Sequence, residues 1–186
     1  MHLTVDNTYK LSDILQYLGT ETTALNQGLY RSCPAVLKLV TDNKVHSFVE
    51  IGTDDSCVSE LLALVFKDID VTCITEDVHH KKLDDEVDGL KTLISTGDDA
   101  CELFDDNSLD MIYFDEHVTH DSVIHNFDLW IPKVRAGGII AGYEPRLGLA
   151  TETHRVVLAI NNYMLANGYI QNSAEENTNV YWFPKQ

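Results

Sequence analysis

Short apolar runs alternate along this chain with stretches whose apolar residues recur at helical spacing. The apolar runs predict five successive strands, at 46–52, 70–75, 91–96, 109–114 and 137–143. Such nearly continuous runs are typical of strands that are buried on both faces, as in a parallel sheet covered by helices. We therefore expect helices and parallel strands to alternate around one sheet.

Helical spacing predicts the segments between these strands. Two helices are expected before the first strand: one over 13–19, capped by Ser12, and one with Pro34 in its first turn that runs through Val40. The remaining helices are expected at 56–67, in part of 79–90, around 99–103, before Pro132 and at 153–168.

The last two predicted strands, 169–174 and 179–183, follow each other without a helix between them, which predicts an antiparallel hairpin. The fold class expected is therefore α/β: a doubly wound, Rossmann-like, mostly parallel sheet of seven strands with a C-terminal antiparallel hairpin. We expect a single domain over 1–186, with a helical N-terminal prelude at 1–44 and the α/β core at 45–186. Ligands of such folds bind at the carboxyl ends of the strands.

Composition and charge narrow the functions that this fold could carry. The chain has 186 residues, of which 44% are hydrophobic, and 13 Lys and Arg face 30 Asp and Glu for a net charge of −17. Such an acidic protein repels phosphate backbones and anionic lipids, so we expect no nucleic-acid partner and no membrane partner. Without a signal segment or an apolar run long enough to span a bilayer, a cytoplasmic protein is expected. Homo-oligomers are compatible with all of this.

Four cysteines, Cys33, Cys57, Cys73 and Cys101, are spread through the chain without a C-x-x-C pair. This spacing argues against a zinc site and against a disulfide framework. We expect reduced thiols that lie mostly in or near the core.

Two segments carry a resemblance to a known family. The first predicted strand ends in EIGTDDS, from Glu50 to Ser56, and leads into a helix; the fourth ends at Asp115 within FDEHVTHDSVIHNFDLWIPKVRAGGIIAGYE. Both segments resemble class I S-adenosylmethionine-dependent methyltransferases, in the branch of small-molecule O-methyltransferases and cephalosporin-hydroxylase-like proteins. The resemblance runs from Val45 to the C-terminus. It implies S-adenosylmethionine as cofactor and methyl transfer to a small-molecule acceptor.

The resemblance also implies a set of cofactor contacts. Glu50, Gly52, Thr53 and Ser56 would cradle the methionine part together with Asp115, Glu76 would accept hydrogen bonds from the ribose hydroxyls, and Asp98 would accept from the adenine amine. Two of these roles have competitors in the sequence. Asp77 stands beside Glu76, and Asp98 could instead cap the helix that follows it.

Asp115 and Glu144 stand where metal-dependent relatives hold a divalent cation such as Mg²⁺, Mn²⁺ or Ca²⁺. A cation there would polarise an acceptor hydroxyl. Asp115 and His120 are the candidate catalytic residues, with His120 as a general base. The competing interpretation is that His120 and its neighbours His117 and His125 are solvent-exposed loop residues without a catalytic role.

The first loop departs from the family pattern, since Asp54 and Ser56 replace two further glycines. This departure predicts weaker binding of the cofactor and leaves a second hypothesis open: a catalytically degenerate methyltransferase fold that acts as a binding or assembly module. A third hypothesis is a metal-assisted enzyme that uses this fold without methyl transfer. The same loop argues more strongly against NAD, because G-x-G-x-x-G is absent and carboxylates beside a pyrophosphate are unfavourable.

Overall fold

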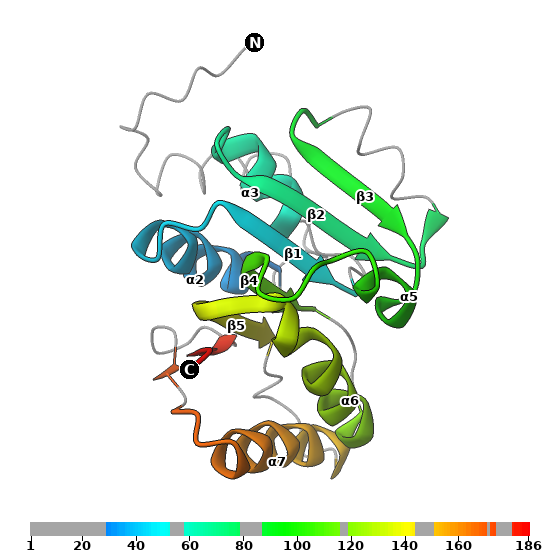
Figure 1. The fold of residues 1–186 in the computed structure, drawn as a ribbon, viewed down its shortest axis with the longest axis vertical. Helices are drawn as coiled ribbons and strands as arrows, with labels where there is room; N and C mark the ends of the chain where they lie inside the picture. Colours follow the sequence, from blue (N-terminus) through cyan, green and yellow to red (C-terminus); the bar gives the residue numbers. More distant parts are fainter. Residues whose placement is uncertain are drawn as a thin grey trace.

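The structure is a computed structural model, and its central feature is a seven-stranded sheet in the order β3-β2-β1-β4-β5-β7-β6 (Figure 1). It describes residues 29–52, 58–78, 87–115, 119–143, 151–170, 172–173 and 180–186. The parallel strands are β1 (Ser47–Ile51), β2 (Asp70–Thr75), β3 (Leu90–Ile94), β4 (Leu109–Phe114) and β5 (Val134–Tyr143). An antiparallel pair, β7 (Val180–Pro184) and β6 (Asn172–Ser173), extends the sheet from β5. The predicted α/β fold with its C-terminal hairpin is confirmed.

Helices cover both faces of the sheet and make two cores. On one face lie α2 (Leu29–Asp42) and α3 (Val58–Val65), and on the other lie α5 (Gly97–Cys101), α6 (His120–Trp130) and α7 (Thr151–Ala166) (Figure 1). A short 3-10 helix, η3 (Ile131–Lys133), follows α6. Successive strand residues point to opposite faces, so β4 contributes Met111 and Tyr113 to the first core and Ile112 and Phe114 to the second. The predicted helix at 13–19 lies outside the described residues.

The sequence predicts Pro34 in the first turn of its helix. In the structure Pro34 lies inside the helix instead. The helix α2 begins at Leu29, five residues earlier. Proline lacks an N–H, so at this position it removes the one hydrogen bond that would reach the carbonyl of residue 30. The loss falls close to the helix start, where unpaired groups are common.

The fifth strand also begins earlier than predicted, at Val134 rather than at Gly137. Gly137 and Gly138 therefore lie within β5 and do not form a turn before it. Between the pairs Leu109↔Val134 and Met111↔Ile139, two steps along β4 correspond to five along β5, so the strand bulges here. Gly137 adopts a φ of 72°, which favours glycine.

The other strand bounds differ little from the predicted ones, except at β6. β2 and β4 match the prediction, β1 and β3 differ from it by one or two residues, and β6 comprises only Asn172–Ser173 of the predicted 169–174. Tyr169 instead closes α7, because its N–H donates to the carbonyl of Met164 at 2.9 Å while Gly168 adopts a φ of 75°.

Two further expectations concern the cysteines and membrane-spanning segments. Cys33, Cys73 and Cys101 are buried, as predicted, whereas Cys57 lies outside the described residues. Among the helices that the structure describes, none combines the length and the apolar character needed to cross a membrane.

Candidate functional site

The carboxyl ends of four neighbouring strands are joined by backbone hydrogen bonds that continue beyond the strands. The N–H of Asp115, after β4, donates to Ile51 of β1 at 2.9 Å, and the N–H of Gly52, after β1, donates to Ile74 of β2 at 3.0 Å. On the far side of β2, the N–H of Ser95 donates to Thr75 at 3.0 Å. Gly52 and Asp115 are therefore neighbours at one edge of the sheet, and Glu76 follows the next strand.

Gly52 turns the chain out of β1 with a φ of 81°, a conformation that side chains disfavour. A glycine is thus required at this point by the backbone itself. Thr53, Asp54 and Ser56 lie outside the described residues.

Glu50 is completely buried near the end of β1. Its carboxylate accepts a hydrogen bond from the backbone N–H of Ser59 at 2.8 Å and another from the Ser59 hydroxyl. These bonds satisfy a donor at the start of α3 and connect the strand to the helix on either side of the loop. The carboxylate of Glu50 therefore supports the loop from within the core.

The chain turns again after β2. The N–H of Asp77 donates to the hydroxyl of Thr75 at 3.1 Å, and Thr75 is itself buried. Glu76 and Asp77 are both exposed at this turn. Either carboxylate is accessible to a ligand at the edge of the sheet.

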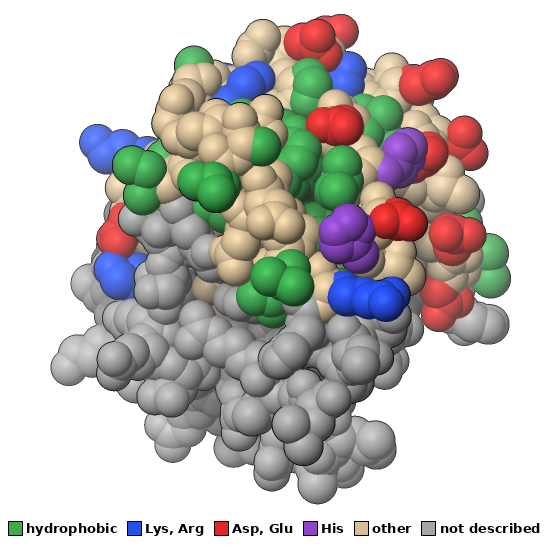
Figure 2. Space-filling model, turned by 90° about the horizontal axis from the view of Figure 1, so that it is seen from below, with side chains coloured by type: hydrophobic (Ala, Val, Ile, Leu, Met, Phe, Trp, Pro, Cys, Tyr) green, Lys and Arg blue, Asp and Glu red, His purple; other side chains and the backbone are tan. Residues whose placement is uncertain are grey.

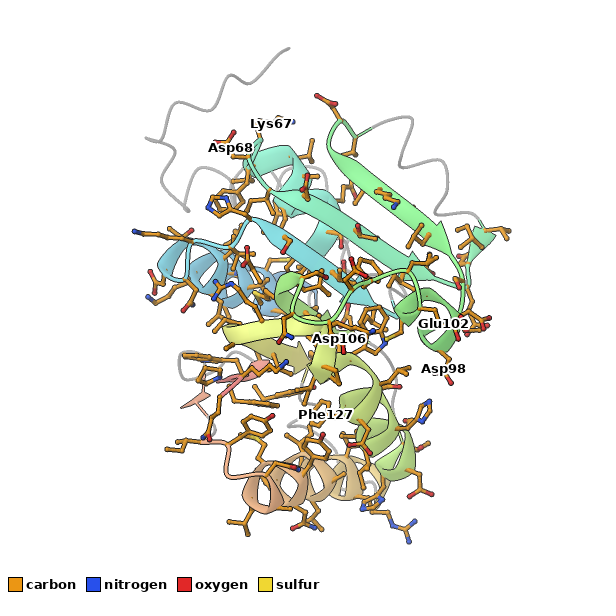
Figure 3. All side chains as sticks on the ribbon, in the orientation of Figure 1. Lys67, Asp68, Asp98, Glu102, Asp106 and Phe127 are labelled. Carbon is orange, nitrogen blue, oxygen red and sulfur yellow. The ribbon has the colours of Figure 1, made fainter. Side chains whose placement is uncertain are left out.

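Asp98 lies in the first turn of α5, after β3, and is not the cap of that helix. The cap is Thr96, whose hydroxyl accepts from the N–H of Asp99 at 3.1 Å, so the capping alternative for Asp98 is wrong. Nε2 of His125, on α6, instead contacts both carboxylate oxygens of Asp98, at 2.9 and 2.8 Å. Figure 3 shows Asp98 on the outer side of α5, towards α6.

Asp115 and Glu144 are the metal ligands that the family resemblance implies. β4 and β5 are paired, with Phe114 opposite Gly142, so the next residues along the two strands are Asp115 and Tyr143. Glu144 lies outside the described residues. Within the described ranges, no group of three or more His, Cys, Asp or Glu residues could hold a metal ion.

His120 is the first residue of α6, after the capping residue Thr119. Its Nδ1 lies 2.8 Å from a carboxylate oxygen of Asp121, and its side chain is 40% exposed. Figure 2 shows two histidine side chains beside acidic ones on one face of the molecule. His117 lies outside the described residues.

Phe127 and Trp130, on α6, are core residues. Trp130 is fully buried against Phe104, and Phe127 packs edge to face against Tyr163 and Phe183 in the core between α6, α7 and the sheet (Figure 3). Neither aromatic ring is available as a platform for an acceptor.

A buried polar cluster lies beside this edge, and the sequence did not predict it. Burial and the charges of Glu50 and Asp115 raise the pKa of the Cys33 thiol, on α2, to about 12. Burial, the charge of Asp115 and that of Glu50 also raise the pKa of Tyr113, on β4. The spacing of Tyr113 and Asp115 could have indicated that they lie together, because residues two apart on a strand share a face.

Comparisons with known proteins rest on solved structures. No protein-family model and no curated protein matches the sequence. A candidate caffeoyl-CoA O-methyltransferase from Staphylococcus aureus is similar in structure, with a TM-score of 0.70 at 15% identity over 97% of this chain and 94% of that one. The chain has the fold of O-methyltransferases. The O-methyltransferase TomG from Streptomyces achromogenes, solved with S-adenosylmethionine, has a TM-score of 0.57 at 12% identity over 94% and 96% of the two chains.

An O-methyltransferase from Bacillus cereus, solved with S-adenosylhomocysteine, has the same methyltransferase fold, with a TM-score of 0.55 at 17% identity over 98% of this chain and 93% of that one. At these identities the comparisons concern the fold. The roles of individual side chains have to be argued from the site itself.

Proposed function

We propose that this protein transfers a methyl group from S-adenosylmethionine to a small-molecule acceptor. One observation carries the proposal: Gly52 after β1, Glu76 after β2 and Asp115 after β4 lie along the same carboxyl edge of the sheet. Ligands of open parallel sheets bind at this edge. Two structural neighbours with the same fold are described in complex with S-adenosylmethionine or S-adenosylhomocysteine, which supports the choice of ligand. A cytoplasmic location forms part of the same proposal.

Each part of the cofactor has a proposed contact in this chain. Gly52 leaves room for the close approach of the methionine part, and Thr53 and Ser56 are the proposed contacts after it. Glu76, exposed at the end of β2, is the acceptor for the two ribose hydroxyls. Asp98 is the acceptor for the adenine amine.

When bound, the cofactor supplies an electrophilic methyl group on a sulfonium. The protein has to orient the acceptor in line with that methyl group and to remove one proton from the acceptor. We assign the proton to His120: Asp121 contacts Nδ1 and would hold a proton there, which leaves Nε2 to accept the proton of the acceptor. Asp115, at the end of β4, orients the acceptor and the methionine part of the cofactor.

A divalent cation is the optional part of the proposal. Asp115 and Glu144 would hold it, because the strands before them are neighbours and adjacent strands lie about 4.8 Å apart. Oxygen ligands of this kind suit Mg²⁺, Mn²⁺ or Ca²⁺. There the cation would lower the pKa of an acceptor hydroxyl.

The test of the proposed function compares two neighbouring acids at the turn after β2. Glu76→Ala should weaken the binding of S-adenosylhomocysteine roughly ten- to a hundredfold, because it removes a charged hydrogen-bond acceptor. Asp77→Ala, at an equally exposed position, is the matched control and should bind like the parent. Calorimetric titration measures both. The reverse result would move the ribose contact to Asp77, and equal binding by all three proteins would remove the ribose role from this turn.

A further inference from the structure

The outward side of α7 carries apolar and amide side chains where a surface helix usually carries charged ones. Four exposed residues at helical spacing form this side, and we call them the outer stripe: Leu158, Asn161, Asn162 and Leu165. Leu165 is 82% exposed and Leu158 is 55% exposed, and Ile170, just after the helix, is 74% exposed. Single exposed leucines are common, but here two of them lie one above the other on one helix.

The inward side of α7 already has its packing partners. Four residues of this side lie in the core with α6 and the sheet, none of them more than 2% exposed: Val156, Ala159, Ile160 and Met164. At the border with α6, the hydroxyl of Tyr163 donates to Asp128 at 2.9 Å. Packing within the chain therefore accounts for the inward side of the helix and leaves the leucines of the outer stripe without a role.

The outer stripe also lies in the longest stretch of the sequence that has no charged residue. Asp, Glu, Lys and Arg are all absent from 156–174, although they make up 23% of the chain and give it a net charge of −17. Figure 2 views the molecule from the end at which α7 lies in Figure 1, and shows hydrophobic side chains across the middle of this face with most acidic ones towards its right border. The absence of charge is thus local to this part of the chain.

Charge decides which occupant suits the outer stripe. In a two-fold dimer the same patch of both copies meets, so a charged group at its centre would face its own like. Leucine and asparagine avoid this conflict, because leucines bury apolar surface against each other and an amide offers its own copy both a donor and an acceptor. A basic partner would instead be drawn to the acidic surfaces, and the net charge repels an anionic lipid surface.

We propose that the outer stripe of α7 is the surface at which a second copy of this chain binds, in a two-fold dimer. The two helices pack against each other at a separation of about 8–10 Å, with the leucines and asparagines of both stripes in contact. Salt strengthens the dimer, because it screens the repulsion between two strongly acidic copies. The inference is independent of the proposed function, since the stripe contains none of the proposed contacts of the cofactor or the acceptor.

The test is sedimentation equilibrium of the parent and of two double variants, at rising protein concentration and at low and high salt. We expect the parent to dimerise with a dissociation constant below about 100 μM at high salt. Leu158→Glu with Leu165→Glu should be monomeric, and so should Leu158→Lys with Leu165→Lys, because like charges then meet across the two-fold axis. An equimolar mixture of the two variants should dimerise again, because opposite charges then meet whichever way the helices run.

The matched control adds the same charge to apolar side chains of similar exposure elsewhere on the surface. Val78→Glu with Leu103→Glu does so, since these side chains are 63% and 69% exposed, and this variant should dimerise like the parent. All of the variants should keep the parent's melting temperature at a concentration where the parent is monomeric, because every replaced side chain is more than half exposed.

Several results would overturn the inference. A parent that stays monomeric at every concentration and at both salt levels has no such dimer, and if it then sediments with neutral phosphatidylcholine vesicles, the outer stripe binds lipid. Dimers of unchanged strength in the Leu158→Glu, Leu165→Glu variant, or their loss in the control, would place the contact elsewhere. A mixture of the Glu and Lys variants that stays monomeric would show that the two stripes do not face each other.

Discussion

Glu50 shows how a single side chain connects the sheet to the loop at the candidate site. Its carboxylate lies in the core with no exposed surface and accepts two hydrogen bonds from Ser59, one from the backbone and one from the hydroxyl. The strand end and the helix start on either side of residues 53–57 are therefore held together. Buried carboxylates of this kind need such donors, because an ion without them is costly to desolvate.

We expect Glu50→Gln to lower the free energy of unfolding by about 1.5–3 kcal/mol, since hydrogen bonds to the charged carboxylate are lost and an amide replaces it in the core. Glu60→Gln, on α3 and only partly buried, is the control and should change it by less than about 0.5 kcal/mol. Urea denaturation measures both variants. Equal midpoints for Glu50→Gln and the parent would show that the hydrogen bonds from Ser59 do not need a charged acceptor.

Asp110 predicts a pH dependence of stability. Its burial opposes ionisation, but hydrogen bonds from Arg135 and from the backbone N–H groups of His46 and Ser47 outweigh this and lower its pKa. A lowered pKa in the folded state stabilises the protein above the unfolded value of about 3.9, and this contribution is lost as the pH falls through the folded pKa.

Asp110→Asn should therefore be less stable than the parent by about 1.5–3 kcal/mol at pH 7, and the difference should shrink as the pH falls below about 4. Denaturation in urea between pH 7 and pH 3 measures the difference. A deficit of the same size at both ends of this range would mean that the ionisation of Asp110 does not carry it.

At the scale of elements, the strands follow the sequence wherever their apolar side chains are continuous. β2 and β4 begin and end as predicted. The early start of β5 escapes prediction because Arg135, Ala136 and Gly137 at its beginning carry no buried apolar side chain. The N–H of Gly137 instead donates to the backbone carbonyl of Lys185, the residue after β7. Pro34 misleads for a similar reason: packing of α2 on the core extends the helix beyond a residue that usually begins one.

The bulge in β5 makes Gly138 a structural requirement. A Cβ at this position would lie 2.6 Å from Val134 Cγ1 and 2.8 Å from the carbonyl oxygen of Asp110. Gly138→Ala should therefore destabilise the protein by about 1–3 kcal/mol. Ala136→Ser, at an exposed position of the same strand, is the matched control and should be near neutral. A thermal unfolding midpoint of Gly138→Ala equal to that of the parent would contradict the bulge geometry.

At the scale of the whole molecule, topology makes the edge of the sheet predictable but not the partners of its side chains. Parallel strands bring Gly52, Glu76 and Asp115 to one edge, and the alternation of strands and helices in the sequence already predicts a parallel sheet with ligands at that edge. The contact between Asp98 and His125 joins residues that are 27 apart on two helices, and no local pattern announces it. Such pairs depend on how α5 and α6 pack.

The metal part of the proposal is tested on the stability of the whole chain. If Asp115 and Glu144 hold a divalent cation, then magnesium, manganese or calcium should raise the melting temperature of the parent, because a ligand that binds only the folded state stabilises it. Asp115→Asn and Glu144→Gln should each lose this effect. With a net charge of −17, non-specific binding of cations is expected, so Asp105→Asn, at an exposed acid, is the control and should keep the parent's response. An unmoved parent melting curve with all three cations would remove the metal.

The most direct measurement for the proposed function is a calorimetric titration of the parent protein with S-adenosylmethionine. We predict binding with a dissociation constant below about 1 mM, weaker than a loop with more glycines would give, since Asp54 and Ser56 follow Gly52 here. The double variant Asp54→Gly with Ser56→Gly should bind more tightly, and NAD should produce no heat in either protein. Absence of any heat from S-adenosylmethionine at millimolar concentration, in the parent and in the double variant, would contradict the proposal and favour a methyltransferase fold that serves as a binding or assembly module.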